Sequence, residues 1–348
     1  MACWIIVRNG RRARFWSLFG HVNLREAWRL FASSQSQDVF VSCHSGSPSL
    51  DVVVTVRLEL GPEELNHFGT QRSSHLAEAG ATVVRRAGPG RRWRMAQGDV
   101  KLIVQGDDFG MCHAVNVGTA QAFREGILTQ ASTMAACPWF TEAAALAREC
   151  AIPLGVHQTL TCEWDFLRWR PLTDGPSLVG DDGTFHRTVA DAKASVTHDD
   201  AVRELSAQVS KFAAEGLTID YLDVHMGLSA PDAYEQISKA TGKPFIYGPE
   251  ESQRFASIEI LSNRDAAVKK TWVLDYIAGL TPGVHLLVTH CAAAHPELAA
   301  MHRPGSETYR WAEEYRRSDQ EIVLDPDVRH AIESRGIELV PLRDAFTD

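Results

Sequence analysis

Short apolar runs alternate with stretches of helical periodicity along the chain from residue 101 onward. The run KLIVQ at residues 101–105 predicts a buried strand, and residues 113–125 predict a helix that ends at Gly126. Further strands are expected near residues 131–136, 152–160, 217–224, 283–290 and 337–341. Further helices are expected near residues 141–150, 199–215, 231–240, 265–277, 308–317 and 326–334. Clusters of Trp, Pro, Asp and Gly predict an irregular insertion at residues 163–197.

A strand followed by a helix, repeated about seven times, is typical of parallel βα units. Such units form either an open doubly wound sheet or a closed barrel. No G-x-G-x-x-G or P-loop pattern follows the first of these strands, which disfavours a nucleotide-binding sheet. We therefore predict an α/β fold, a distorted TIM-like (β/α) barrel of about seven parallel βα units, as a single catalytic domain over residues 95–348.

The first 94 residues differ sharply in charge from the rest of the chain. They contain thirteen Arg, no Lys and seven acidic residues, although the whole chain has a net charge of −9. A change this sharp marks a boundary. We predict that residues 1–94 are an Arg-rich extension, poorly ordered or absent from a native protein that starts at Met95. An accessory segment with a strand near residues 51–56, a targeting peptide and a nucleic-acid-binding arm are alternatives.

The composition excludes several classes of protein. Apolar residues make up 45% of the chain and charged residues 23%, as in globular proteins, and no apolar stretch is long enough to span a membrane. The seven cysteines are scattered and include no C-x-x-C pair, which argues against a disulfide framework and a zinc knuckle. We therefore expect a cytoplasmic protein that binds no membrane and no nucleic acid.

Acidic and histidine side chains occur at the ends of several predicted strands. They are Asp107, Asp108, His157, Asp223, His225 and His290. In a parallel βα fold the carboxyl ends of the strands converge on one rim, where active sites form. Imidazole and carboxylate groups suit a divalent metal ion. Any one of these residues alone is more often a helix cap, a turn residue or a core histidine, so the pattern by itself supports a metal hydrolase only as a hypothesis.

The neighbouring carboxylates Asp107 and Asp108 are the most informative pair. A bound cation would offset their mutual repulsion, so that one carboxylate binds the ion while the other accepts a proton from water. Adjacent side chains of a strand point to opposite faces, so the turn that begins at Asp108 must re-aim one of them. The glycines on either side, Gly106 and Gly110, permit this change of direction.

Six segments are informative through their actual residues as well as through their spacing. In chain order they are VQGDDFGM, REGILTQASTM, LGVHQTLT, YLDVHMG, LLVTH and RGIELV. Together they resemble the YdjC-like (ChbG/HpnK) carbohydrate deacetylases over residues 100–345, whereas residues 1–94 take no part. The resemblance implies a distorted (β/α) barrel that binds one divalent metal ion, Mg²⁺ or Zn²⁺. It also implies hydrolysis of the acetyl group of an N-acetylated amino sugar or oligosaccharide, with release of acetate.

The resemblance also implies roles for individual residues. Asp108, His157 and His225 match the family's metal ligands, and Asp107 matches its catalytic base. His290 matches a later histidine beside the reacting group, which in its protonated form could stabilise the oxyanion or donate a proton to the leaving amine. Three protein ligands leave positions open for water and the acetyl oxygen, as a catalytic metal site requires.

Contacts to a substrate are predicted from the insertion and from one strand end. Asp223 is expected to orient a metal ligand or to touch substrate, while Trp164, Trp169 and Arg170 form either a sugar-stacking wall or a packed loop core. The segment DVHMGLS lacks the further histidines of the chitooligosaccharide branch, and HCA replaces the family's HPG after residue 289. These departures disfavour a chitobiose-like substrate.

Two other functions stay open at the level of the sequence. One is metal-dependent hydrolysis of a different amide or ester, such as an O-acetyl group on a sugar. The other is a catalytically silent sugar-binding barrel, against which the complete set of Asp and His residues argues. We expect a small-molecule carbohydrate as the substrate and consider a homodimer as the assembly.

Overall fold

The computed structural model describes residues 3–8, 38–45, 52–58, 99–306 and 308–346. The chain divides into two compact units, Met1–Arg94 and Met95–Asp348. In the first unit, strands β1 (Cys3–Arg8), β2 (Asp38–Ser45) and β3 (Val52–Leu58) form an antiparallel sheet in the order β1-β2-β3. Strand β3 confirms the strand expected near residues 51–56. The prediction that this extension is poorly ordered or absent from the native protein stays a prediction.

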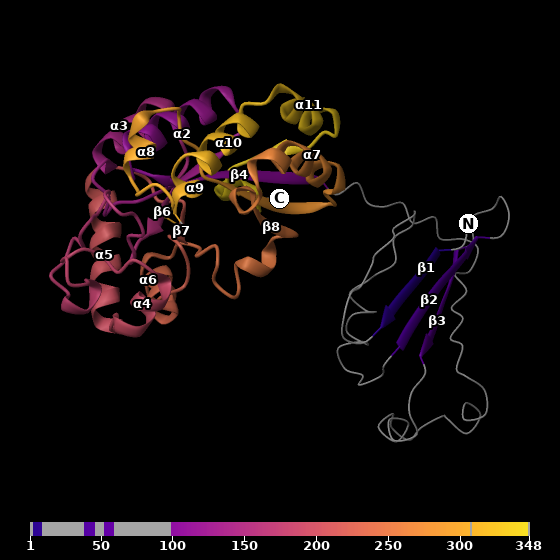
Figure 1. The fold of residues 1–348 in the computed structure, drawn as a ribbon, viewed down its shortest axis with the longest axis horizontal. Helices are drawn as coiled ribbons and strands as arrows, with labels where there is room; N and C mark the ends of the chain where they lie inside the picture. The colour runs from indigo at the N-terminus through magenta and orange to yellow at the C-terminus, as the bar shows by residue number, and fades with distance from the viewer. Residues whose placement is uncertain (1–2, 9–37, 46–51, 59–98, 307, 347–348) are drawn as a thin grey trace, which may run out of the picture. The chain divides into compact units, whose positions relative to one another are not determined.

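A parallel sheet forms the centre of the second unit (Figure 1). Its strands are β4 (Val100–Phe109), β5 (Gln130–Thr133), β6 (Leu154–Gln158), β7 (Tyr221–Val224), β8 (Ser257–Ile260), β9 (Gly283–Thr289) and β10 (Glu338–Leu339). They pair in the order β7-β6-β5-β4-β9-β8, and β10 pairs with the beginning of β4. Every ladder in this sheet is parallel, as the alternation of strands and helices in the sequence predicts.

Helices cover this sheet. They are α2 (His113–Glu125), α3 (Phe140–Cys150), α4 (Val189–Ser195), α5 (His198–Ala214), α6 (Pro231–Thr241), α7 (Lys269–Gly279), α8 (Pro296–Ala300), α9 (Tyr309–Ala312), α10 (Glu314–Val323), α11 (Pro326–Ser334) and α12 (Leu342–Ala345). Helix α2 packs against α3, α8 and α10, α5 packs against α6, and α7 packs against α10 and α11 (Figure 1). Within the described ranges, no helix combines the length and the apolar character that crossing a membrane requires.

Strand β4 is buried on both faces because it lies in the middle of the sheet. Leu102 and Val104 pack into one apolar cluster, and Ile103, which points to the opposite face, packs into another. At the ends of the strand order lie β7 and β8, and no ladder joins them in the described part of the chain. The sheet is therefore a parallel α/β half-barrel with six strands along the path from β7 to β8 and with β10 beside β4, and its closure into about seven βα units stays a prediction.

Most elements lie where the sequence predicts them, although the short helices α8 and α12 were not expected and three other elements differ. Strand β8 was not expected, because the segment SIEI is short and only half-buried. Helix α4 lies inside the segment expected to be irregular, and the Thr188 side chain caps it by accepting from the Asp191 N–H. The helix expected at residues 308–317 is two helices, α9 and α10, which are interrupted at Glu313.

Candidate active site

A bulge in β4 brings two neighbouring carboxylates to the same end of the sheet. The register between β4 and β5 shifts between Gly106 and Phe109, where Asp107 and Asp108 lie. Asp108 has a left-handed backbone with φ 66°, which Asp tolerates better than most residues, and Gly110 follows with φ 100°. The change of direction expected from the sequence is therefore carried by Asp108 itself together with Gly110, and Gly106 stays in the strand.

Asp108, His157 and His225 converge on one point from β4, β6 and the end of β7. The Oδ1 atom of Asp108 lies 3.3 Å from His157 Nε2 and 3.1 Å from His225 Nδ1. One possible ligand atom from each residue lies within 4.8 Å of the others, and all three side chains are buried. The structure thus brings one oxygen and two nitrogens from the three predicted metal ligands close together.

The far nitrogen of each imidazole contacts an oxygen atom. His157 Nδ1 lies 3.3 Å from Asp223 Oδ2 and 3.0 Å from Ser132 Oγ, and His225 Nε2 lies 3.0 Å from Glu163 Oε2. Outer contacts of this kind fix the orientation of a metal-binding histidine and raise its basicity. Asp223 is fully buried and contacts His157, as expected of a residue that orients a metal ligand, while its contact with substrate stays a prediction. Glu163 contacts His225 in the same way, although the sequence did not single it out.

A buried arginine holds the second oxygen of Asp108. Arg316 of α10 donates from Nη2 to Asp108 Oδ2 at 2.6 Å, and its guanidinium lies 5.4 Å from the centre of the Trp164 ring. Nothing in the sequence indicated this partner, because Arg316 lies in a charged helix 208 residues from Asp108. With Oδ2 held by Arg316, Oδ1 of Asp108 is left to face the two imidazoles.

A chain of buried amides ends at Asp107 and Asp223. Gln105 Nε2 donates to Asp107 Oδ1 at 2.8 Å and to Asp223 Oδ2 at 2.6 Å. Gln105 Oε1 accepts from Gln130 Nε2 at 2.6 Å, and Gln130 Oε1 accepts from the backbone N–H of Leu342 at 2.7 Å. Burial and the nearby carboxylate of Asp223 raise the pKa of Asp107 well above its ordinary value. Asp107 therefore takes up a proton more readily than an exposed Asp does.

The charges at the centre of the site fit a cation. Burial would lower the pKa of both imidazoles, but the surrounding carboxylates raise the pKa of His157 well above its ordinary value and that of His225 to about 9. Burial would raise the pKa of Asp108, but Arg316 and His225 hold it well below its ordinary value. Both rings thus carry a proton toward Asp108 Oδ1 when no metal ion is bound. A divalent ion would replace these protons, so this donor set fits a divalent metal.

His290 follows β9 and lies near the same centre. Its Nδ1 atom is 2.9 Å from Ser262 Oγ, and its ring meets the Trp311 ring edge-on at a centroid distance of 5.4 Å. Burial lowers the pKa of His290 to about 3, an effect that Asp108 opposes and Arg316 strengthens. At neutral pH the resting ring is therefore neutral. The protonated form considered from the sequence is not the resting state.

The insertion after β6 places its tryptophans inside the protein. Trp164 and Trp169 are almost fully buried, and the centre of the Trp169 ring lies 6.0 Å from that of His225. Both rings therefore belong to a packed loop core, the second of the two arrangements considered from the sequence. Arg170, in contrast, is exposed.

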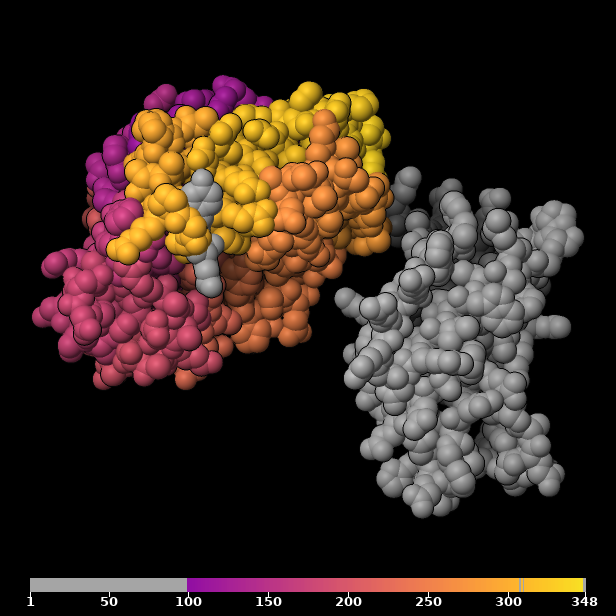
Figure 2. Space-filling view, in the orientation of Figure 1, coloured from indigo at the N-terminus to yellow at the C-terminus, as the bar shows by residue number. Residues whose placement is uncertain are grey.

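Exposed apolar side chains lie close to the site in sequence. Phe166 of the insertion is 60% exposed, and Met226, which follows His225, is 55% exposed. The backbone N–H of Phe166 donates to the carbonyl oxygen of Met301 at 2.9 Å. This contact joins the insertion to the segment after β9, and Figure 2 shows the two parts of the chain, in magenta and yellow, meeting on one face.

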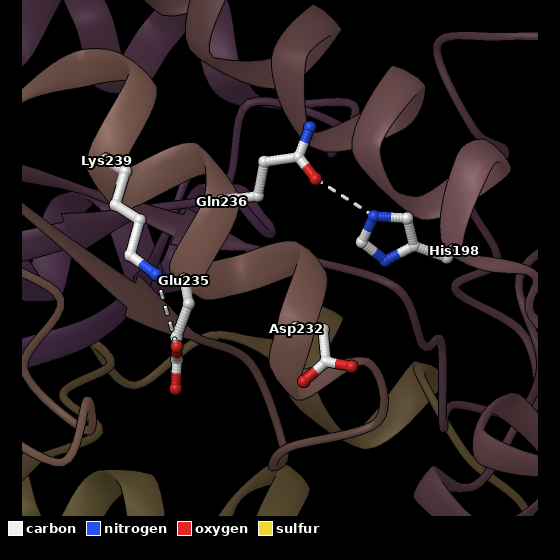
Figure 3. Close-up of a pocket in the computed structure, with 5 residues that line it drawn as sticks. All are labelled: His198, Asp232, Glu235, Gln236 and Lys239. Atoms are coloured by element: carbon white, nitrogen blue, oxygen red, sulfur yellow. Dashed lines mark hydrogen bonds and ion pairs between the residues drawn. The ribbon is translucent and has the colours of Figure 1, made fainter.

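A surface hollow lined from α5 and α6 lies apart from these residues (Figure 3). Its lining consists of His198, Asp232, Glu235, Gln236 and Lys239. His198 Nε2 and Gln236 Oε1 lie 2.9 Å apart across it. None of the residues predicted to be catalytic or metal-binding lines this hollow, so it is not the candidate active site.

A family model described as YdjC-like protein matches residues 101–334, which is well over half of the chain. The chain belongs to the YdjC-like protein family. The match confirms the resemblance that the sequence motifs indicate, and the matched range includes the bulge in β4 and all three predicted metal ligands.

Relatives of this YdjC-like chain include proteins named carbohydrate deacetylase. One from Brevibacillus brevis is 34% identical over 169 residues, which cover 46% of this chain and 65% of the relative. One from Geobacillus stearothermophilus is 40% identical over 124 residues, which cover 35% of this chain and 48% of the relative. The chain thus spans 65% and 48% of the length of these two relatives.

A solved structure from Enterococcus faecalis V583 shares the fold. It is described as a candidate cellobiose-phosphate cleavage protein and is 23% identical to this YdjC-like chain. The comparison covers 70% of this chain and 97% of that structure, with a TM-score of 0.58. The likeness supports the parallel α/β architecture of residues 95–348.

Proposed function

We propose that this YdjC-like protein is a metal-dependent hydrolase that removes the acetyl group from an N-acetylated amino sugar or oligosaccharide and releases acetate. The observation that carries the proposal is the convergence of Asp108, His157 and His225, with ligand atoms within 4.8 Å of one another. Asp107 and His290 beside them can exchange protons. The names of the relatives, carbohydrate deacetylases, support the same substrate class.

The metal site of the proposal is formed by Asp108 Oδ1, His157 Nε2 and His225 Nδ1. A divalent ion held there supplies Lewis acidity, which polarises an amide carbonyl and makes water more acidic. Two imidazoles suit Zn²⁺ and a carboxylate also suits Mg²⁺, so either ion is proposed. A closed, distorted barrel, a cytoplasmic location and a homodimer belong to the same proposal.

The protein's own groups orient and transfer protons. Arg316 holds Asp108 Oδ2, which keeps Oδ1 directed at the two imidazoles. Gln105 donates to Asp107 and fixes its carboxylate. Asp107 accepts a proton from water as the water oxygen attacks the acetyl carbon, and its raised pKa favours this transfer. His290, on which the charges of Asp108 and Arg316 act, is the second group that exchanges protons.

Acetate release from a panel of N- and O-acetylated sugars, with and without a chelator, tests this function. We expect release from N-acetylated amino sugars that a chelator abolishes and added Zn²⁺ or Mg²⁺ restores. Asp107→Asn should lower kcat by roughly 100-fold or more because it removes the proton acceptor. Asp174→Asn, which changes an exposed carboxylate of the insertion, is the matched control and should leave kcat unchanged.

The two alternatives give different results in the same assay. Release from O-acetylated sugars alone would identify an esterase and contradict the N-deacetylase. Metal binding and sugar binding without any acetate release would identify a silent sugar-binding barrel.

A further inference from the structure

We propose that Ser262 and Asp319 are positioning residues that hold His290 as its Nδ1–H tautomer, so that the lone pair of Nε2 faces the reactants. The inference names two further residues for the proposed deacetylation and rests on that function. It assigns His290 the role of a proton acceptor that becomes a donor only after it has taken up a proton.

The three residues form a continuous line of contacts. His290 Nδ1 lies 2.9 Å from Ser262 Oγ, and Ser262 Oγ makes a short contact with Asp319 Oδ2. The same Asp319 oxygen accepts from the backbone N–H of His290 at 2.8 Å. Lys269 Nζ lies 2.5 Å from the other oxygen of Asp319. Ser262, Asp319 and Lys269 are fully buried, so these contacts form a fixed group.

The direction of the hydrogen bonds follows from the number of protons available. Burial raises the pKa of Asp319, but Lys269 opposes this, and both oxygens of Asp319 face donors, as in an ionised carboxylate. The single hydroxyl proton of Ser262 therefore points to Asp319. Ser262 Oγ can then only accept from His290, so the ring proton must lie on Nδ1. Since the ring is neutral, Nε2 carries a lone pair.

The Nε2 atom is available for this role. It makes no hydrogen bond to any of the described residues, and the ring of His290 is half-buried rather than enclosed. The Trp311 ring packs edge-on against the His290 ring, and this apolar contact places no hydrogen-bonding group of Trp311 on Nε2. The charges of Asp108 and Arg316 act on His290, which places it beside the candidate metal site.

Amide hydrolysis requires two proton transfers, and the tautomer of His290 determines which atom carries the proton in the second transfer. As the water oxygen bonds to the acetyl carbon, one water proton passes to Asp107. As the carbon–nitrogen bond breaks, the remaining hydroxyl proton passes to the Nε2 lone pair of His290 and from there to the amine nitrogen. Acetate and the free amine result, and Asp107 returns its proton to solvent. The Nδ1 proton stays bonded to the ring throughout, donated to Ser262.

The chain contains a matched control for the Ser262 contact. Ser257 Oγ lies 2.8 Å from His285 Nδ1, and the two residues are separated by 28 positions, as are Ser262 and His290. Both pairs join the region of β8 to β9. His285 lies near the beginning of β9, whereas His290 follows its end, so only one of the two pairs belongs to the candidate site.

The experiment measures the His290 tautomer by ¹⁵N–¹H correlation NMR of the imidazole rings in the full chain, with His290→Gln used to assign the signal. We expect Nδ1–H in the wild type and a gain of Nε2–H in Ser262→Ala. The same variant should lose at least roughly tenfold in kcat, with KM and bound metal unchanged. Ser262→Thr, which keeps the hydroxyl, should restore both readouts, and Ser257→Ala should change neither.

The outcomes separate the positioning role from the function itself. An Nε2–H tautomer in the wild type would overturn the positioning role without the need for a folded Ser262 variant. An unchanged tautomer in Ser262→Ala would overturn it as well. If acetate is not released from any sugar but His290 is the Nδ1–H form, the proposed function fails while the hydrogen-bond assignment stands.

Discussion

Three histidines of the candidate site share one arrangement at the level of single atoms. In His157 and His225, one ring nitrogen faces Asp108 and the other contacts an oxygen atom of the protein, and Nδ1 of His290 likewise contacts a protein oxygen. The oxygen atoms behind His157, His225 and His290 come from Asp223, Glu163 and Ser262 respectively. Each ring is thus fixed in orientation before any ligand arrives, which lowers the reorganisation needed for catalysis.

Glu163 can be tested by a change that keeps its shape. Glu163→Gln removes the negative charge behind His225 Nε2, so His225 becomes a weaker metal ligand. We expect the affinity for Zn²⁺ to fall by about 10- to 100-fold, as measured by competition with a chelator of known affinity. Glu250→Gln, an exposed residue of the same type, should leave the affinity unchanged. An equal effect of both variants would contradict a specific role of Glu163.

Metal binding should depend on pH because protons occupy the same nitrogens. The metal-free pKa of His225 is about 9, and that of His157 is also raised. Below pH 9 an arriving ion must displace these protons, so we expect affinity to rise with pH by roughly tenfold to a hundredfold per unit until about pH 9. Calorimetry in buffers of different ionisation enthalpy measures the protons released. Binding without proton release would contradict the proposed ligands.

At the level of secondary-structure elements, α2 packs closely against the segment after β9 at Gly118. A Cβ atom at Gly118 would lie 2.5 Å from the backbone nitrogen of Ala293 and 2.6 Å from Cα of Ala292. The N–H of Ala293 also donates to the carbonyl of Ala114 in α2 at 2.9 Å. Because this segment continues directly from His290, the position of α2 and that of His290 are linked.

Gly118→Ala should therefore affect both stability and catalysis. The added methyl group has to push two backbone segments apart, so we expect the free energy of unfolding to fall by about 1–3 kcal/mol. We also expect kcat to fall, since His290 moves with the displaced segment. Denaturant unfolding and acetate release measure the two effects. Gly279→Ala in α7, where a Cβ meets no atom within 4 Å, should be neutral or stabilising.

The sequence predicts elements and strand-end residues better than it predicts partners. Asp108 and His157 follow or interrupt apolar runs, so the pattern of a parallel fold is enough to bring them to one rim. Arg316 and Asp319 lie in a charged helix whose buried side has no distinctive motif. Ser262 contacts Asp319 across 57 positions, and a single sequence gives no signal for such a pair.

At the scale of the whole molecule, the candidate site belongs to one of the two units. Its residues run from Gln105 to Asp319, and the polar chain behind them reaches Leu342, all within Met95–Asp348. The antiparallel strands β1, β2 and β3 contribute none of these residues. The described residues that form the site therefore all come from the second unit.

A protein that begins at Met95 should accordingly keep the metal affinity and acetate release of the full chain. Chelator competition and the acetate assay on the two proteins provide the comparison. A loss of more than about tenfold in either quantity, beyond any loss of stability, would contradict the assignment of the site to the second unit. Mass spectrometry of the native N-terminus tests separately whether residues 1–94 are present in the cell.

The side-chain amides of Gln130 and Gln105 fix the donor-to-acceptor direction of the hydrogen bonds at the site. Each amide has one donating end and one accepting end, so reversing either glutamine would place like ends against each other. The backbone N–H of Leu342, 212 positions from Gln130, sets the order, and Gln105 in turn points its two amide hydrogens at Asp107 and Asp223. The backbone N–H of Leu342, near the C-terminus, thus determines the direction of the hydrogen bonds that reach Asp107 and Asp223.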